Sequence, residues 1–408
     1  MKNTKKRIAM VAACPFPANR GTPSRILQMS ESLAELGYDV HVVTYHIGIN
    51  IKTKCIKIHR IPNIPTYSKL SSGPAYQKPF LDFLLLLKLL KVVRKEKIDL
   101  IHGHHYEGGF VSLMVRKLTG VPVIYDAHAD LVEEMVQFKF LSGNRFLRYF
   151  WKMIGEYVPA SSDYIVTVSD ELKQILMRQG INSEKIAVIP TGVNPETFEN
   201  GDRIMVRKEL GIEENPIIMY TGNLSPFQGI DNLIKSMPFI VDKISNAMLV
   251  IAGGPDEYML KYQALVDKLG ISKNVIFVGE KPFQDLPDLL AAADVVVSPR
   301  ISCPGIPQKL SNYMAAGKAI VSFEGSAKTL TNNYNGLIIK NNDLDGFAEA
   351  IIKLIKDDKL SKKFGDNAKK SIKGNLDWEY LASKLDVIYK QILYKSTNVG
   401  NISEGDGI

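Results

Sequence analysis

Short apolar runs alternate with longer amphipathic stretches along the whole chain, starting with "RIAMVAA" at residues 7–13. Short runs bounded by turn residues are typical of buried strands, and the stretches between them have the spacing of helices. This alternation predicts an α/β chain built on parallel sheets. The predicted strands are 7–13, 39–45, 55–61, 99–105, 122–128, 163–169 and 185–191, then 216–222, 247–253, 274–280, 294–300, 318–323 and 336–340.

A polar connection punctuated by Gly and Pro, around residues 191–215, separates the two series of strands. A chain of 408 residues exceeds the size at which one core keeps growing, so two domains are expected. We predict two Rossmann-like domains that face each other across a cleft, at 1–195 and 196–375. Helical spacing predicts a last helix at 376–394, and the polar tail 395–408 is expected to be disordered.

The amino terminus has a basic head and a short apolar segment that ends at Cys14, so a lipoprotein signal has to be considered. The apolar part, Ile8–Ala13, is shorter than the roughly 7–15 residues of a signal peptide, and it is predicted to be the first strand. No uninterrupted apolar run reaches the ~18 residues of a membrane span. Three scattered cysteines, the others being Cys55 and Cys303, fit a reducing cytoplasm.

The formal charge of +8 lies in the first half of the chain. Residues 1–199 hold 26 Lys and Arg against 18 Asp and Glu, whereas 200–408 hold 25 of each kind. This asymmetry favours an anionic partner for the first half, either a membrane surface or a nucleic acid. A basic surface without a partner is the alternative.

The loop after the first strand lacks the G-x-G-x-x-G of dinucleotide-binding domains, because Gly21 is its only glycine. A dehydrogenase is therefore disfavoured. Thr22 and Pro23 instead open a helix whose free amides can face an anion, with Arg25 one turn further. The alternative is a capping Thr22 and a solvated Arg25.

Histidines follow two of the predicted strands. Alternation along a strand places His102 and His104 on one face, at the end where open α/β sheets bind ligands. His128 ends the next strand beside Asp126. Such a cluster could form a metal site of the amidohydrolase type, but no barrel repeat accompanies it. Sugar binding by His128 is the preferred interpretation, and a structural histidine is the alternative.

The segment 298–321 joins two buried strands through a turn and a short helix, and it has basic side chains but no carboxylate. A diphosphate held there would gain the helix N-terminus and charge-assisted hydrogen bonds of about 1.5–3 kcal/mol each. Helical spacing predicts that residues 308, 309 and 312 share one face. The residues concerned are Arg300, Pro307, Gln308, Lys309 and Asn312. A plain turn is the alternative.

A series of motifs resembles the family 4 glycosyltransferases, retaining enzymes of the GT-B fold, from about Ile8 to Ile392. They include "PFPANRGTPSRI", "DLIHGHHYEGG", "YDAH", "VIPTGVNPETF", "YTGNLSPFQGIDNLI", "VIAGGPDE", "VIFVGE" and "GIPQKLSNYMAAGKAIV". The resemblance implies an acceptor-binding first domain and a donor-binding second domain. It also implies a final helix that crosses back to the first.

Site residues follow from this resemblance together with the patterns above. The predicted catalytic residues are His128, Arg300 and Lys309. The predicted acceptor-binding residues are His102, His104 and Tyr106. The predicted donor-binding residues are Gly21, Thr22, Arg25, Asn223, Gln228, Gly254, Gly279, Gly305, Ile306, Pro307, Gln308 and Asn312. No metal and no cofactor beyond a UDP- or GDP-linked sugar is expected.

The chain departs from the family pattern at four positions. The usual E-x7-E reads Pro304 and Asn312, and the Arg and Lys expected after the first donor-domain strand are Asn223 and Gln228. We hypothesise that cationic groups at positions 300 and 309 replace the missing ones and that Asn312 still binds the ribose. An inactive relative that keeps the fold is the alternative.

The resemblance implies a front-face transfer in which the leaving phosphate accepts the acceptor's proton, so that charge stabilisation and positioning dominate catalysis. The expected function is transfer of a hexosyl or N-acetylhexosaminyl group to a glycan or lipid-linked acceptor. Basic, apolar stretches at 80–97 and 138–152 suggest a cytoplasmic enzyme at the inner face of the plasma membrane, contacting anionic lipid and not nucleic acid. Alternatives are a sugar-nucleotide epimerase and a non-catalytic binder.

Overall fold

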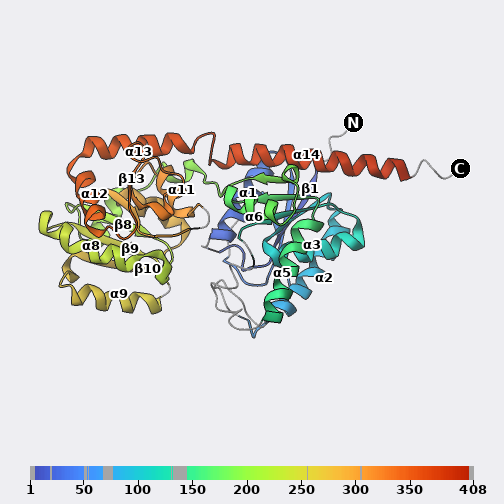
Figure 1. The fold of residues 1–408 in the computed structure, drawn as a ribbon, viewed down its shortest axis with the longest axis horizontal. Helices are drawn as coiled ribbons and strands as arrows, with labels where there is room; N and C mark the ends of the chain where they lie inside the picture. Colours follow the sequence, from blue (N-terminus) through green and yellow to red (C-terminus); the bar gives the residue numbers. More distant parts are fainter. Residues whose placement is uncertain are drawn as a thin grey trace. The chain divides into compact units, whose positions relative to one another are not determined.

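The structure is a computed structural model that describes residues 5–18, 21–49, 53, 55–67, 77–129, 131, 145–254, 256–303 and 306–403. The chain forms two compact units. Unit 1 comprises Met1–Pro190 and Trp378–Ile408, and unit 2 comprises Thr191–Asp377. The chain therefore leaves unit 1 at Pro190 and returns to it at Trp378 (Figure 1).

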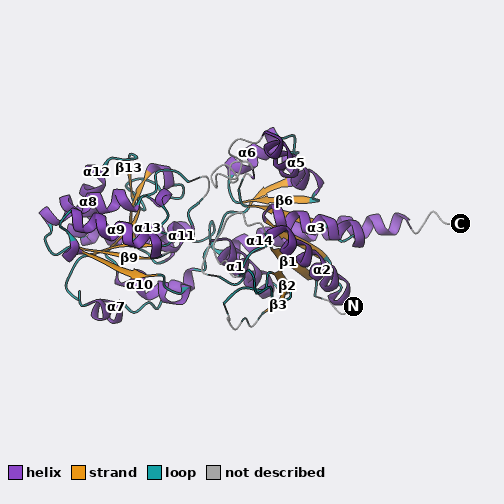
Figure 2. Cartoon of the chain, turned by 90° about the horizontal axis from the view of Figure 1, so that it is seen from below, coloured by secondary structure: helices purple, strands orange, loops and turns teal. Residues whose placement is uncertain are grey.

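Unit 1 is built on a seven-stranded parallel sheet in the order β3-β2-β1-β4-β5-β6-β7. Continuous Val- and Ile-rich runs form these strands because both faces of the sheet are covered by helices, as Figure 2 shows. The strands are β1 (Arg7–Ala12), β2 (Asp39–Thr44), β3 (Ile56–Arg60), β4 (Leu100–His104), β5 (Val123–Ala127), β6 (Tyr164–Thr167) and β7 (Ile186–Val188).

The two faces of this sheet carry different helices. One apolar cluster packs α1 and α14 on one face, and another packs α2, α3, α5 and α6 on the other. Because α14 belongs to unit 1, the carboxyl-terminal end of the chain completes the core of its first domain. The helices are α1 (Gly21–Glu35), α2 (Lys78–Glu96), α3 (His105–Thr119), α5 (Arg145–Ser161), α6 (Asp170–Arg178) and α14 (Trp378–Ser403).

Unit 2 repeats this architecture with a six-stranded parallel sheet in the order β10-β9-β8-β11-β12-β13. Its strands are β8 (Ile217–Thr221), β9 (Met248–Ala252), β10 (Val275–Gly279), β11 (Val295–Ser298), β12 (Ala319–Phe323) and β13 (Leu337–Ile339). Its helices are α7 (Arg203–Leu210), α8 (Ile230–Lys243), α9 (Asp256–Lys268), α10 (Leu286–Ala292), α11 (Gln308–Ala315), α12 (Leu344–Lys356) and α13 (Asp358–Ile372).

The predicted α/β class with two parallel sheets is confirmed, and every described strand lies inside its predicted range. The disordered tail is a wrong prediction as far as Ser403, because α14 continues to that residue. Helical hydrogen bonds propagate along a helix that is anchored by packing, even where its sequence turns polar. Residues 404–408 lie outside the described part. None of the described helices has the length and apolarity needed to cross a membrane.

Candidate functional site

Each sheet has one point at which the strand order reverses, between β1 and β4 in unit 1 and between β8 and β11 in unit 2. In open α/β sheets, ligands bind beyond the carboxyl ends of the strands at such points. The loops that follow these four strands, together with the helices that come directly after them, contain most of the predicted site residues. The topology therefore identifies two half-sites, which are described separately below.

The unit 1 half-site is organised around Asp126, which lies in β5 and is fully buried. The Arg25 guanidinium donates to both carboxylate oxygens, with Nη2 at 3.1 Å from Oδ2 and 3.3 Å from Oδ1. Arg25 also donates to the carbonyls of Ile189 and Pro190, at 2.9 and 2.7 Å. It is 1% exposed, so its hydrogen bonds are all internal.

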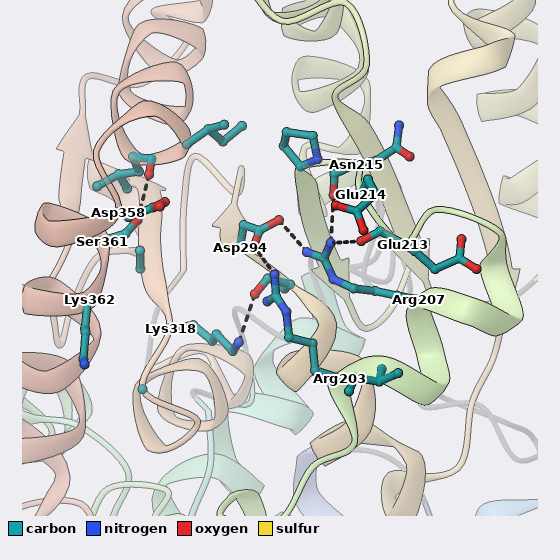
Figure 3. Close-up of a pocket in the computed structure, with 17 residues that line it drawn as sticks. Arg203, Arg207, Glu213, Glu214, Asn215, Asp294, Lys318, Asp358, Ser361 and Lys362 are labelled. Carbon is teal, nitrogen blue, oxygen red and sulfur yellow. Dashed lines mark hydrogen bonds and ion pairs between the residues drawn. The ribbon is translucent and has the colours of Figure 1, made fainter.

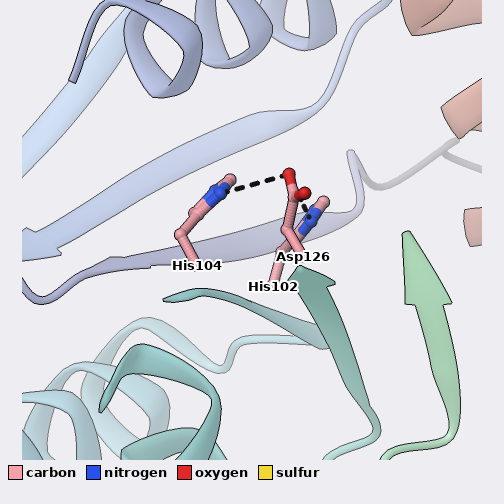
Figure 4. A group of neighbouring side chains, drawn as sticks. All are labelled: His102, His104 and Asp126. Carbon is pink, nitrogen blue, oxygen red and sulfur yellow. Dashed lines mark ion pairs between the residues drawn. The ribbon is translucent and has the colours of Figure 1, made fainter. Parts of the chain in front are cut away.

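Two histidines of β4 lie beside this carboxylate, as Figure 4 shows. His104 Nδ1 is 3.3 Å and His102 Nε2 is 3.6 Å from Oδ2 of Asp126, and the two imidazoles stack with centroids 4.7 Å apart. The other ring nitrogen of His102, Nδ1, lies 2.6 Å from the hydroxyl of Tyr389 in α14. Both histidines are buried by this helix and by α1.

His128 is the outermost residue of the group. Its Nε2 lies 3.7 Å from Oδ1 of Asp126 and 3.4 Å from Nδ1 of His104. The ring of His105 stacks on it at 4.2 Å, and His105 Nε2 is 2.9 Å from the Thr22 hydroxyl. His105 has a φ of 58°, which few non-glycine residues adopt. The beginnings of α1 and α3 thus support His128.

The charges of this group balance. Burial would raise the pKa of Asp126, but the Arg25 guanidinium and the neighbouring histidines hold it well below its ordinary value. Burial lowers the pKa of His104 to about 4. Burial and the charge of His105 lower the pKa of His128 far below its ordinary value. The half-site therefore offers a neutral imidazole at neutral pH.

Four side chains that were predicted to bind ligands at this half-site are buried. Arg25 was expected to bind donor and His102, His104 and Tyr106 to bind acceptor, but all four side chains are at most 4% exposed. Arg25 is held by a carboxylate 101 residues away, and Tyr106 packs at 5.4 Å from the ring of Tyr125. Thr22 and Gly21 remain near the surface.

The unit 2 half-site is centred on the amine of Lys309, in α11. Its Nζ donates to Oε1 of Gln228 at 3.0 Å and to the hydroxyl of Tyr220 at 2.5 Å. The Tyr220 hydroxyl donates in turn to the carbonyl of Asn223, at 2.6 Å. Within the described part of the chain, no carboxylate lies within ion-pair distance of this amine. The fold thus places a half-buried cation against the first loop of unit 2 without an acidic partner.

Arg300 follows β11 and lies over the ring of Phe227, with 4.9 Å between its Cζ and the centroid. Its Nε donates to the carbonyl of Ser302. Burial and then the charge of Arg300 lower the pKa of Lys309 far below its ordinary value. A bound anion would reverse this effect, so the half-site is electrostatically matched to negative charge.

The remaining predicted donor residues lie on several elements of unit 2. Gln308 Nε2 donates to Asn312 Oδ1 at 3.2 Å and to the Gly192 carbonyl at 3.1 Å, so this pair shares a face as predicted, while Lys309 points towards β8. Pro307 is the N-cap residue and precedes the first helical turn. Gly254 accepts from Leu224 N at 2.8 Å, Gly279 ends the edge strand β10, and Ile306 is half-buried. Gly305 and Pro304 lie outside the described residues.

Family models match both halves of the chain. Residues 20–197 match the model described as Glycosyltransferase Family 4, and residues 202–371 match that described as Glycosyl transferases group 1. The chain belongs to glycosyltransferase family 4. The family resemblance expected from the sequence motifs is thus confirmed, and the chain is a glycosyltransferase.

Two curated relatives align with almost the whole length of this chain. The D-inositol 3-phosphate glycosyltransferase of Kribbella flavida is 24% identical over 413 residues, covering 94% of this chain and 95% of the relative. The Escherichia coli UDP-Gal:alpha-D-GlcNAc-diphosphoundecaprenol alpha-1,3-galactosyltransferase is 25% identical over 404 residues, covering 95% and 98%.

Two solved structures have the same fold as this family 4 glycosyltransferase. Sucrose-phosphate synthase from Thermosynechococcus elongatus has a TM-score of 0.79 at 20% identity, covering 96% of this chain and 100% of that one. Anabaena HepE in complex with UDP has a TM-score of 0.72 at 16% identity, covering 95% and 100%. These likenesses confirm the GT-B fold class.

A metal-like arrangement occurs in unit 1 of this glycosyltransferase. Ligand atoms of His102, His104 and Asp126 all lie within 4.8 Å of one another. The carboxylate, however, already pairs with the Arg25 guanidinium, and a divalent cation would have to share it with a buried positive charge. The donor set therefore fits an internal ion pair better than a metal centre.

A cavity of about 800 Å³ opens at the amino ends of β8, β11 and β12, the edge of the sheet opposite the unit 2 half-site. Figure 3 shows Arg203 and Arg207 converging on Asp294, with Lys318 nearby. Lys318 Nζ donates to the carbonyls of Ala291 and Ala293, where α10 ends. These contacts hold helix ends and strand starts together, so the polar lining is structural.

Some functional residues were not predicted from the sequence. Tyr220 lies in the motif "YTGN", and a tyrosine that ends a buried strand before a loop could have been singled out. Tyr389 has no comparable signal, because it is 287 residues from its partner His102 and reads as an ordinary core residue of a helix.

Proposed function

We propose that this glycosyltransferase moves a hexosyl or N-acetylhexosaminyl group from a nucleotide diphosphate sugar to a glycan or lipid-linked acceptor, with retention of configuration. The main support is the amine of Lys309, which lies at the switch point of unit 2 with Gln228 and Tyr220 as partners and no acidic one among the described residues. The name of the E. coli relative, which specifies UDP-Gal and a diphosphoundecaprenol acceptor, supports donor and acceptor class.

In the proposed mechanism, the bond between the anomeric carbon and the diphosphate breaks as the acceptor hydroxyl attacks from the same face. The departing phosphate oxygen takes the hydroxyl proton, so no separate base is needed. Lys309 and Arg300 stabilise the negative charge that develops on the diphosphate, and the amides before α11 add to this. Neutral His128 is assigned a hydrogen bond to the donor sugar.

The position of the Lys309 amine supports the compensation hypothesis. A cation missing at residue 228 is supplied by a side chain that reaches Gln228 from α11, 81 residues later. Arg300 lies beside Phe227 in the same loop and would compensate for Asn223. Asn312 is 5% exposed, so its assigned ribose contact requires an edge of the amide and not the whole side chain.

The experiment that tests the proposed function is a donor screen followed by product analysis. UDP- and GDP-linked hexoses and N-acetylhexosamines are compared by thermal shift, and the stabilising donor is incubated with and without acceptor. Slow release of free sugar, and an acceptor product with the donor's anomeric configuration by proton NMR, would support the proposal. Formation of an epimer, or binding without any turnover, would instead indicate the epimerase or the non-catalytic binder.

We also propose that the transfer needs no divalent cation, because Arg25 neutralises the carboxylate of the metal-like group found among the described residues and basic groups face the diphosphate site. The rate of transfer is expected to be unchanged after EDTA treatment and after addition of Mg²⁺ or Mn²⁺. Loss of activity in EDTA that either metal restores would contradict this prediction.

An anionic lipid surface is the proposed membrane partner of unit 1. The inner face of α2, with Leu81, Leu85 and Leu89, packs on the sheet. Its outer face exposes Phe80 (54%), Phe83 (56%) and Leu87 (47%). Basic residues Lys91, Arg94 and Lys95 lie further along the exposed side. Apolar and basic side chains on one helix suit a membrane interface.

The second predicted stretch, 138–152, lies largely outside the described residues.

Sedimentation with vesicles tests this contact. The protein is expected to pellet with vesicles of anionic lipid at low salt and to be released at high salt, because exposed charges are screened beyond ~8 Å at physiological ionic strength. The double variant Phe83→Ser/Lys91→Glu should lose most of this binding, whereas Lys340→Glu, an exposed lysine of unit 2, should keep it. Equal binding of all three proteins would argue against α2 as the contact.

A further inference from the structure

The two places where the chain crosses between the units both contact Arg25. On leaving unit 1, the chain presents the carbonyls of Ile189 and Pro190 to the guanidinium. On returning, it begins α14 with Trp378, whose ring lies 5.6 Å from the guanidinium carbon of Arg25. One buried side chain therefore touches both crossings from within unit 1.

The same guanidinium holds Asp126, which in turn lies beside His104 and His128. Arg25, His104 and Asp126 are at most 1% exposed, and His128 is partly buried. In a close-packed interior, a shift of one such group is passed to its neighbours, because there is no water to take up the displacement. A displacement at either crossing thus reaches His128 through two intermediate residues, Arg25 and Asp126.

A second connection runs from the middle of α14. The hydroxyl of Tyr389 bonds to Nδ1 of His102, whose Nε2 faces Asp126 at 3.6 Å. In an imidazole, the hydrogen bond at one nitrogen sets which nitrogen carries the proton. When the Tyr389 hydroxyl donates to Nδ1, the Nε2–H points at Asp126. The returning helix thereby contributes directly to the arrangement of the carboxylate.

We propose that Arg25 and Tyr389 are positioning residues that couple the two chain crossings to His128 through Asp126. Units joined by short crossings are expected to move relative to each other, so the crossings are where such motion enters unit 1. The coupling makes the orientation of the His128 imidazole depend on the state of the crossings. The effect of this coupling on catalysis rests on the proposed function, in which His128 binds the donor sugar. The coupling itself does not depend on that role.

The test uses the imidazole NMR signals of the full-length protein, which has seven histidines. Tyr389→Phe and Trp378→Phe each keep a ring in place and are expected to shift the signals of His102, His104 and His128. The matched control is Tyr394→Phe. Tyr394 lies in the same helix, α14, but its side chain is 72% exposed, so loss of its hydroxyl should leave the His104 and His128 signals unchanged. A thermal melt of each variant verifies that it folds.

Nucleotide binding and activity give a second readout. In Tyr389→Phe, kcat is expected to fall about 2- to 10-fold, the effect of one lost hydrogen bond, with the donor KM nearly unchanged. The coupling would be refuted if a folded Tyr389→Phe variant showed the same His104 and His128 signals as Tyr394→Phe. If UDP and GDP both failed to bind the wild-type protein, the proposed function would fail, while the imidazole shifts would still decide the coupling.

Discussion

Replacing Lys309 by Met is expected to weaken binding of the donor's nucleoside diphosphate about 10- to 100-fold, as measured by calorimetry. The reason is that a charge-assisted hydrogen bond to phosphate contributes about 1.5–3 kcal/mol, and the amine has no other ionic partner among the described residues. The kcat should fall by at least as much, because the same charge stabilises the leaving group. Lys340→Met removes an exposed lysine of unit 2 and should have no effect. Wild-type affinity in Lys309→Met would end the compensation hypothesis.

The same interaction should make binding depend on pH. In the free protein, burial and Arg300 hold the pKa of Lys309 well below its ordinary value, and a bound diphosphate raises it. Between these two values, binding takes up a proton, so the affinity should decrease as pH rises through this window. Calorimetry in buffers of different ionisation enthalpy measures that proton uptake, which should be absent in Lys309→Met.

Removing the buried guanidinium is expected to cause the largest loss of stability. Arg25→Met leaves Asp126 buried and unpaired, which should lower the free energy of unfolding by about 3–5 kcal/mol and the melting temperature by roughly 10 °C. The loss of unfolding free energy caused by Arg25→Met should be greatest above the ordinary carboxyl pKa, where Asp126 is charged. It should diminish as pH falls and the carboxyl becomes protonated.

Two comparisons isolate the buried charge as the cause. The double variant Arg25→Met/Asp126→Asn has no unpaired charge and should recover part of the lost stability. Arg203→Met breaks an exposed pair with Asp294, where Arg203 is 46% exposed, and should cost less than about 1 kcal/mol. If the double variant were less stable than Arg25→Met, the unpaired carboxylate would not explain the loss.

The strands and the two-sheet class were predictable because apolar periodicity is a local property of the sequence. For the site, the sequence predicted which loops take part. Lys309 was predicted to replace a cation that the family has at residue 223 or 228, and in the structure Nζ of Lys309 contacts Gln228. Alternation along β4 also placed His102 and His104 on one face, which their stacked rings bear out.

The role of Arg25 was not predictable, because it depends on which strands are neighbours. From the sequence alone, an arginine one turn into a helix, with no acidic residue near it, is predicted to be an unpaired cation. Its partner belongs to β5, and only the sheet order brings that strand's carboxyl end near the beginning of α1. The burial of His102 likewise depends on Tyr389 of α14, the last element of the chain.

The assignment of α14 to unit 1 has a consequence for how the protein is made. During synthesis the first 190 residues and all of unit 2 leave the ribosome before residues 378–403, so Ile8, Met10 and Val42 lack the cover of α14 until that helix is made. Unit 2 can complete its core while one apolar face of unit 1 is still open to solvent. Nascent and carboxyl-terminally truncated chains should therefore be the aggregation-prone forms, and chaperones should stay bound to the amino-terminal domain until α14 has been made.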